Sequence, residues 1–180
     1  SLKEGLKIAG LPESSIQLVP TRDRDAVGEL LRMTDYVDII VPRGGRSLIE
    51  RISSDSRIPM FKHLEGICHI YVDEAADEQM AREIIVNAKM RRTGICGAAE
   101  TLLMQRDVAS SMLNSIVGDL VNAGCEIRGD SEAKAIDERI VPATKDDWDT
   151  EYLDSIITIG IVEDVHEAMR HINKHGSQHT

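Results

Sequence analysis

The stretch "CHIYVDEAADEQMAREIIVNAKM" (residues 68–90) joins an apolar run to an amphipathic one. Residues 68–73 have the composition of a buried β-strand. From Met80 to Ala88 apolar residues recur every three or four positions, which predicts a helix with one apolar face that ends before Gly94. A strand followed by such a helix is the unit from which parallel α/β sheets are built.

The alternation of strand and helix continues toward the end of the chain. Further elements are expected at 101–105 (strand), 107–124 (helix), 155–162 (strand) and 164–176 (helix). Asp107 and Asp164 are the expected N-caps of the two helices, because an aspartate at a helix start accepts hydrogen bonds from free backbone N–H groups. The interval 128–148 is polar and carries no strand or helix prediction.

Helix-like and strand-like segments also alternate in the first 63 residues, where each segment is shorter. We expect helices at 1–10, 22–33 and from Ser47 onward, and strands at 15–20, 37–42 and 58–63. The order strand, helix, strand predicts part of a parallel sheet. The chain starts without Met and stops soon after a helix, so we expect it to be an internal piece of a longer protein.

The composition excludes several functional classes. A net charge of −10 and an aromatic content of 3% argue against nucleic-acid binding, which relies on basic side chains and stacking rings. The sequence has neither an apolar run long enough to cross a bilayer nor a signal peptide, so we predict a cytoplasmic protein without membrane contact. The three cysteines lack zinc-ligand spacing, so we expect free thiols and no metal.

Cys96 lies in "RRTGICGAAETLL" (residues 91–103), between Gly94 and Gly97 and after two arginines. Backbone N–H groups at a turn and nearby cations favour the thiolate, so this cysteine is a candidate nucleophile. A small hydrophobic residue in a core is the alternative, since buried cysteines are common and mostly inert. The spacing alone leaves both interpretations open.

Two further groups of residues are candidates for binding. The "VPRGG" turn (residues 41–45) precedes a predicted helix and therefore either binds an anion at the helix start or simply joins strand to helix. His166, His171 and His175 are expected on a solvated face of the last helix, whereas His179 lies in the loop after it and is the one expected to reach a ligand. His63, Glu65, Cys68 and His69 do not predict a metal site, because neighbours in a strand point to opposite faces.

Five motifs in this order, "VPRGG", "KHLEGICHIYVD", "NAKMRRTGICGAAETLL", "DDWDTEYLD" and "HINKHGSQHT", resemble the gamma-glutamyl phosphate reductases, also called glutamate-5-semialdehyde dehydrogenases. This family belongs to the aldehyde dehydrogenase superfamily. The resemblance implies an α/β fold in which residues 1–62 are part of a Rossmann-like, dinucleotide-binding parallel sheet and residues 63–180 a truncated catalytic domain. It further implies NADPH-dependent reduction of L-glutamyl 5-phosphate to L-glutamate 5-semialdehyde, with release of phosphate, in L-proline biosynthesis.

The resemblance also assigns roles to individual residues. Cys96 would form the thioester intermediate, and its backbone N–H would stabilise the oxyanion. Arg43, Gly44 and Gly45 would lie beside the phosphates of NADPH. Glu151 would hold the nicotinamide ribose.

Arg91, Arg92 and His179 are assigned by charge alone, as candidates to hold the substrate's phosphate or carboxylate. At the place of the general-base glutamate that hydrolytic relatives carry in an E-L-G-G-K motif, this chain has Lys62 or His63. The absence of that base favours reduction of the thioester over its hydrolysis. The longer protein would form homo-oligomers and be coupled functionally to glutamate 5-kinase.

Two alternatives stay open on the sequence alone. One is a non-catalytic α/β module that binds an anionic metabolite through the glycine turn, with Cys96 in a structural role. The other is an inactive fragment of the reductase, because the first half of the dinucleotide fold and a C-terminal segment would be missing.

Overall fold

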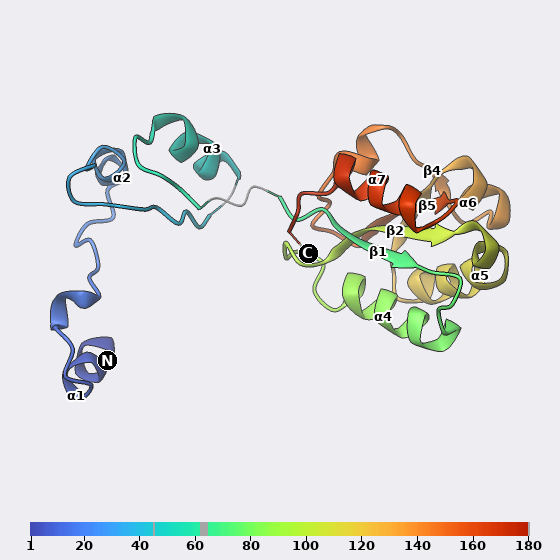
Figure 1. Ribbon diagram of the computed structural model, residues 1–180, viewed down its shortest axis with the longest axis horizontal. Coiled ribbons are helices and arrows are strands. Elements are labelled where there is room, and N and C mark those ends of the chain that lie inside the picture. The colour runs from blue at the N-terminus through green and yellow to red at the C-terminus, as the bar shows by residue number, and fades with distance from the viewer. Residues whose placement is uncertain (45, 62–64, 180) are drawn as a thin grey trace. The chain divides into compact units, whose positions relative to one another are not determined.

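The computed structural model describes residues 1–44, 46–61 and 65–179. The chain divides into two compact units, Ser1–Lys62 and His63–Thr180 (Figure 1). We call them the N-terminal unit and the C-terminal unit.

The C-terminal unit is built on a five-stranded sheet with strand order β1-β2-β5-β3-β4. All neighbouring strands are parallel. The strands are β1 (Cys68–Val72), β2 (Ala99–Gln105), β3 (Glu126–Gly129), β4 (Val141–Pro142) and β5 (Ile156–Val162). The α/β fold class predicted from the sequence is therefore confirmed for this unit.

Helices cover both faces of the sheet (Figure 1). One face is covered by α4 (Glu78–Met90), α5 (Arg106–Asn122) and α6 (Ser131–Ile136), and the other by α7 (Val165–His175) and the short 3-10 helix η2 (Asp146–Asp149). This arrangement follows from the alternation of side chains along β2. Leu102 and Met104 belong to the cluster that includes α4 and α5, whereas Leu103 belongs to the cluster with Ala168 of α7.

Helices α1 (Leu2–Ile8), α3 (Arg46–Asp55), α4, α5 and α7 lie within about two residues of the ranges predicted from the sequence, whereas α2 (Asp25–Leu30) is shorter than the predicted 22–33 and α6 lies in the interval that carried no prediction. Asp164 caps α7 by accepting a hydrogen bond from the N–H of Glu167. The expected cap at Asp107 is wrong, because α5 begins at Arg106 and Gln105 is its N-cap, without a side-chain hydrogen bond. Strands β3 and β4 were not predicted, because both are short and lie in a polar stretch of the sequence.

The N-terminal unit contains helices but little sheet. Its elements are α1 (Leu2–Ile8), the 3-10 helix η1 (Glu13–Ser15), α2 (Asp25–Leu30) and α3 (Arg46–Asp55). A single parallel bridge between Ile40 and Met60 replaces the strands predicted at 37–42 and 58–63. The strand predicted at 15–20 is wrong, since residues 16–20 form neither strand nor helix and Leu18 is 92% exposed. Extended segments form strands only where a neighbour pairs with them.

No helix of the described residues combines the length and the apolar character that crossing a bilayer requires.

Candidate active site

Cys96 lies in the loop that leads from α4 into β2, three residues before the strand begins. It is the exposed member of the three free cysteines, which excludes the core position that the sequence left open. Within the described part of the chain, its backbone N–H makes no hydrogen bond. The loop therefore presents a thiol and a free N–H group from the same residue.

Gly66 packs against the backbone of Cys96 from the segment that leads into β1. A Cβ atom on Gly66 would lie 1.8 Å from the carbonyl oxygen of Cys96, so no larger residue can occupy this position without moving the loop. The N–H of Gly66 donates a hydrogen bond of 2.8 Å to Oε1 of Glu151. Gly66 thus brings Glu151, predicted to bind the cofactor, close to the Cys96 loop.

The segment after α7 completes this end of the sheet. The hydroxyl of Ser177 accepts a hydrogen bond of 2.9 Å from the N–H of Ile67. Nδ1 of His179 lies 3.8 Å from Sγ of Cys68, and that thiol donates a hydrogen bond of 3.2 Å to the carbonyl oxygen of Cys96. The structure therefore brings together three residues predicted from the sequence, Cys96, Glu151 and His179.

Lys89 of α4 and Glu100 of β2 flank the Cys96 loop and form an ion pair, 2.6 Å between Nζ and Oε2, and both side chains are buried. Burial raises the pKa of Glu100 above its usual range although Lys89 acts in the opposite direction. The other carboxylate oxygen of Glu100 accepts a hydrogen bond of 3.4 Å from the N–H of Leu153. The pair connects the end of α4, the start of β2 and the segment that carries Glu151.

A second polar network holds the segment that carries Glu151, through its neighbour Tyr152. The hydroxyl of Tyr152 donates a hydrogen bond of 2.7 Å to Oδ1 of Asp147, which also pairs with Arg128 at 2.6 Å. Burial raises the pKa of Asp147, but hydrogen bonds from the N–H of Thr144, from Arg128 and from Tyr152 outweigh it and lower the pKa. Glu151 is therefore placed between two anchored neighbours, Tyr152 and η2.

Three histidines and Trp148 gather on the α7 face of the sheet. The ring of His171 lies 5.4 Å from that of His69, 5.0 Å from that of Trp148 and 4.6 Å from that of His175, measured between centroids. Nδ1 of His175 lies 2.7 Å from Oδ1 of Asp149. Burial, assisted by His175 and His69, lowers the pKa of His171 to about 4.

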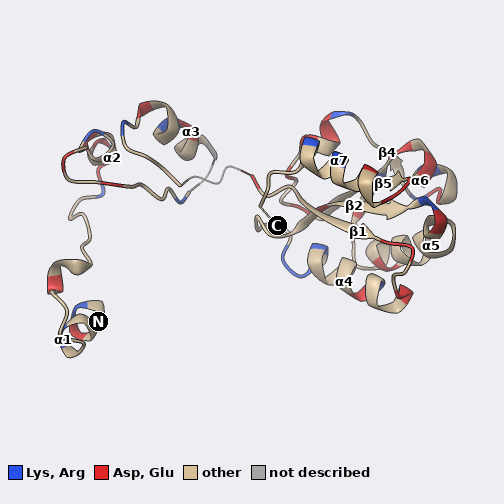
Figure 2. Ribbon diagram, in the orientation of Figure 1, with Lys and Arg blue, Asp and Glu red and all other residues tan. Residues whose placement is uncertain are grey.

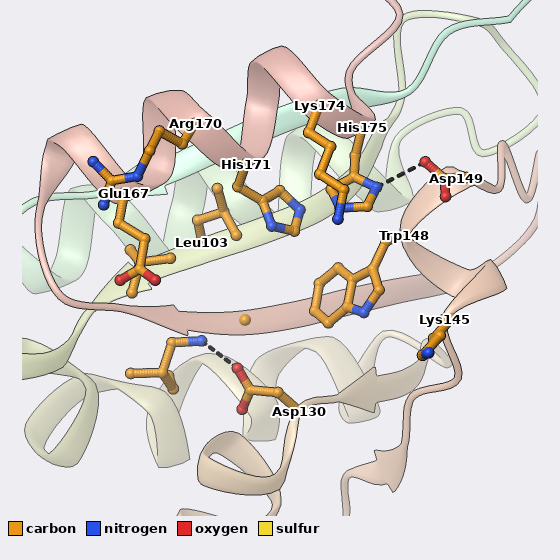
Figure 3. A pocket seen from close by; sticks show the side chains of 13 residues that line it. Leu103, Asp130, Lys145, Trp148, Asp149, Glu167, Arg170, His171, Lys174 and His175 are labelled. Carbon is orange, nitrogen blue, oxygen red and sulfur yellow. Dashed lines mark hydrogen bonds and ion pairs between the residues drawn. The ribbon is translucent and has the colours of Figure 1, made fainter.

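A cavity of about 620 Å³ opens beside this histidine cluster, between α7 and the segment around η2 (Figure 3). Its lining includes Lys145, Trp148, Gly160, His171 and Lys174. None of the site residues predicted from the sequence is among the described residues that line it. The cavity is therefore separate from the Cys96 site.

The other described residues that were predicted for the site are Arg91, Arg92, Arg43 and Gly44. Arg91 and Arg92 are exposed and directly follow α4, where the Cys96 loop begins. Figure 2 shows how the basic and acidic residues are distributed over the elements of the chain. Arg43 and Gly44 lie in the N-terminal unit, directly before α3. Gly45 lies outside the described residues, as do Lys62 and His63 at the place of the general base.

Sequence reasoning missed Gly66, Cys68, Ser177 and the pair Lys89 and Glu100. Gly66 and Ser177 act through contacts with residues 85 and 110 positions away, which local spacing does not reveal. Lysine and glutamate usually lie at the protein surface, so only the structure shows that Lys89 and Glu100 are buried as an ion pair.

The difference in exposure predicts which cysteine reacts first. We expect iodoacetamide at pH 8 to alkylate Cys96 on the order of a hundredfold faster than Cys125. Cys125 is 6% exposed, and burial raises its pKa to about 11. The three cysteines fall in separate tryptic peptides (residues 63–82, 93–106 and 107–128), so mass spectrometry can follow each one. Equal rates in the folded chain would contradict this expectation, whereas equal rates in urea are expected.

The histidine cluster predicts a pH-dependent stability. The folded chain keeps His171 neutral down to a pH of about 4, whereas the unfolded chain protonates it near pH 6.5. As the pH falls from 6.5 to 4, the unfolded state therefore binds more protons, and the free energy of unfolding falls by up to about 1.4 kcal/mol per pH unit from this group. Urea titrations of His171→Phe should show a flatter pH profile than those of His166→Phe, a control at an exposed position of α7. Identical profiles would contradict the role of His171.

Comparison with known proteins identifies the family of this chain. The family model described as the aldehyde dehydrogenase family matches residues 2–132. A curated gamma-glutamyl phosphate reductase of Paramagnetospirillum magneticum is 58% identical over the whole chain, which spans 43% of that protein's length.

Solved structures agree with this relationship. The crystal structure of gamma-glutamyl phosphate reductase from Thermotoga maritima has a TM-score of 0.87 at 42% identity, covering 97% of this chain and 42% of that one. A glyceraldehyde-3-phosphate dehydrogenase from Methanocaldococcus jannaschii, complexed with NADP, has a TM-score of 0.66 at 16% identity, with 96% of this chain and 46% of that one covered, which shows a shared fold. The resemblance seen in the sequence motifs is thus confirmed, and the chain belongs to the aldehyde dehydrogenase family.

Proposed function

We propose that this chain supplies the thiol site of a gamma-glutamyl phosphate reductase, an oxidoreductase that converts L-glutamyl 5-phosphate to L-glutamate 5-semialdehyde. The observation that carries the proposal is the exposed Cys96 in its glycine-flanked loop, in a chain 58% identical to a protein of that name. The activity belongs to a protein of the relatives' full length, of which this chain spans about 43%. We assign that protein to L-proline biosynthesis in the cytoplasm.

Cys96 is the nucleophile in this proposal. Its thiolate attacks the acyl carbon of L-glutamyl 5-phosphate, the bond from that carbon to the phosphate oxygen breaks, and inorganic phosphate leaves. The product is a thioester on Cys96. The free N–H of Cys96 donates a hydrogen bond to the oxyanion that forms during the attack.

The chain's residues suit a nicotinamide cofactor. Oε1 of Glu151 is occupied by the N–H of Gly66, and Glu151 offers its second carboxylate oxygen to a ribose hydroxyl. Arg43 is exposed and Gly44 precedes the N-terminus of α3, where backbone N–H groups attract phosphate. Gly45 is assigned to the same phosphate site on the sequence resemblance. NADPH, when bound, supplies the hydride that reduces the thioester to the aldehyde.

The substrate's charged groups require basic partners near Cys96. Arg91 and Arg92 are exposed at the start of its loop, and His179 contacts Cys68, whose thiol donates to the Cys96 carbonyl. We assign the three residues to the phosphate and the carboxylate of L-glutamyl 5-phosphate.

The two units receive distinct roles in this proposal. The N-terminal unit is part of the dinucleotide-binding domain, and the C-terminal unit is the catalytic domain. The full-length protein forms homo-oligomers and uses the acyl phosphate that glutamate 5-kinase makes.

The test uses the reverse reaction in a protein that contains this chain at its relatives' full length. We expect NADP-dependent oxidation of L-glutamate 5-semialdehyde to require inorganic phosphate, because phosphate must release the acyl group from Cys96. The measurement compares NADPH formation with and without phosphate and identifies the product. Oxidation at the same rate without phosphate, with free glutamate as the product, would show a hydrolytic aldehyde dehydrogenase instead.

A further inference from the structure

Two of the three cysteines meet at the start of the sheet. Cys68 is the first residue of β1 and is 5% exposed, and its Sγ lies 3.2 Å from the carbonyl oxygen of the exposed Cys96. Cys125 precedes β3, which is separated from β1 by β2 and β5, and its thiol donates to the carbonyl of Glu126. Cys68 is thus next to the reactive residue, and Cys125 is not.

We propose that Cys68 and Cys96 are an oxidative modification site, at which a hydroperoxide converts the two thiols into a reversible disulfide. The proposal rests on the reactivity of Cys96 proposed above. A disulfide would block the thiol that forms the thioester and would protect it from irreversible oxidation.

The reaction has two steps. In the first, the Cys96 thiolate attacks one oxygen of hydrogen peroxide, the O–O bond breaks and hydroxide leaves. The sulfur is oxidised by two electrons to a sulfenic acid, and the peroxide is reduced. In the second, the Cys68 thiol loses its proton and its sulfur attacks the sulfur of Cys96, so that the S–O bond breaks and water leaves. Nδ1 of His179 lies 3.8 Å from Sγ of Cys68 and is placed to accept that proton, which then passes to the departing hydroxide to give the water.

The close approach of the two residues favours the bond. The thiol of Cys68 already contacts the backbone of Cys96, and Gly66 holds that backbone against the entry to β1. Gly97 has open space around it, since a Cβ atom there would meet no atom within 4 Å, so no neighbouring side chain restricts the position after Cys96. Bond formation requires the Cys96 side chain to turn toward the Cys68 thiol.

The experiment treats the folded chain with hydrogen peroxide, alkylates the remaining thiols and maps the tryptic peptides without reductant. We expect one cross-link, between the peptides 63–82 and 93–106, that dithiothreitol removes. Cys125→Ser is the matched control and should give the same cross-link. In Cys68→Ser, Cys96 should proceed to the sulfinic acid, and the fraction of Cys96 recovered by dithiothreitol should fall on the order of tenfold.

The peptide map of the peroxide-treated chain without substitutions tests the proposal even if Cys68→Ser does not fold. Four results would overturn the proposal: Cys96 as sulfinic acid beside a free Cys68, a bond from Cys68 to Cys125, a bond between Cys96 residues of two chains, or an unoxidised Cys96. Failure of the proposed function looks different. In that case the disulfide forms, but loss of Cys96 leaves the phosphate-dependent activity of the full-length protein intact.

Discussion

Replacing Lys89 with methionine is expected to lower the free energy of unfolding by about 3–5 kcal/mol, because it leaves the carboxylate of Glu100 buried without its partner. Lys89 is 0% and Glu100 1% exposed, and Nζ and Oε2 lie 2.6 Å apart. Without the ammonium group, burial of Glu100 would raise its pKa further. Urea denaturation followed by circular dichroism measures the change.

Two variants separate the buried charge from the loss of packing. In Lys89→Met combined with Glu100→Leu, most of the lost stability should return, because an apolar pair of similar volume needs no partner. Arg82→Met removes the cation of a half-buried pair with Asp119, also 2.6 Å apart, and should cost no more than about 1 kcal/mol. If Lys89→Met cost as little as Arg82→Met, the ion pair would not anchor the Cys96 loop.

Replacing Cys96 with alanine is expected to reduce the rate of phosphate-dependent oxidation of the semialdehyde by a factor on the order of a thousand or more. Losses of this size are typical when an enzyme's nucleophile is removed. No other described thiol is exposed to take its place, since Cys68 and Cys125 are buried. The measurement is kcat/KM in a protein of the relatives' full length that contains this chain. The free energy of unfolding should change little, because the side chain of Cys96 is exposed.

Cys125→Ala is the matched control for this loss of activity. It removes a buried thiol that donates to the carbonyl of Glu126 at the start of β3, and β5 separates β3 from the β2 strand that follows Cys96, so kcat/KM should stay near that of the unmodified protein. Activity that persists in Cys96→Ala, or that disappears equally in Cys125→Ala, would remove Cys96 from the mechanism.

The sequence predicted those parts of the fold that have a regular apolar period. β1, α4, β2, α5, β5 and α7 all lie within or next to their predicted ranges. β3 escaped detection because Glu126 and Arg128 form ion pairs on it and give it a polar composition. The strand predicted at 15–20 failed for the opposite reason, since its apolar residues are exposed and no second strand pairs with them.

The site was predictable only in part. Glycines beside Cys96 indicated a thiol at a turn, but the contacts that hold the turn come from Gly66 and Cys68, residues that the fold brings close. Likewise, the resemblance assigned Glu151 to the cofactor, but only the structure shows its hydrogen bond to Gly66. Residue types at a spacing suggest chemistry, whereas the groups that position them are set by long-range packing.

The covalent intermediate on Cys96 can be trapped and identified directly. The full-length protein that contains this chain is mixed with L-glutamate 5-semialdehyde and NADP in the absence of phosphate, quenched in acid and digested. The proposed mechanism predicts one γ-glutamyl group on the peptide 93–106, attached to Cys96 and released by added phosphate. An adduct on the peptide that carries Cys68, or turnover without any adduct on Cys96, would contradict it.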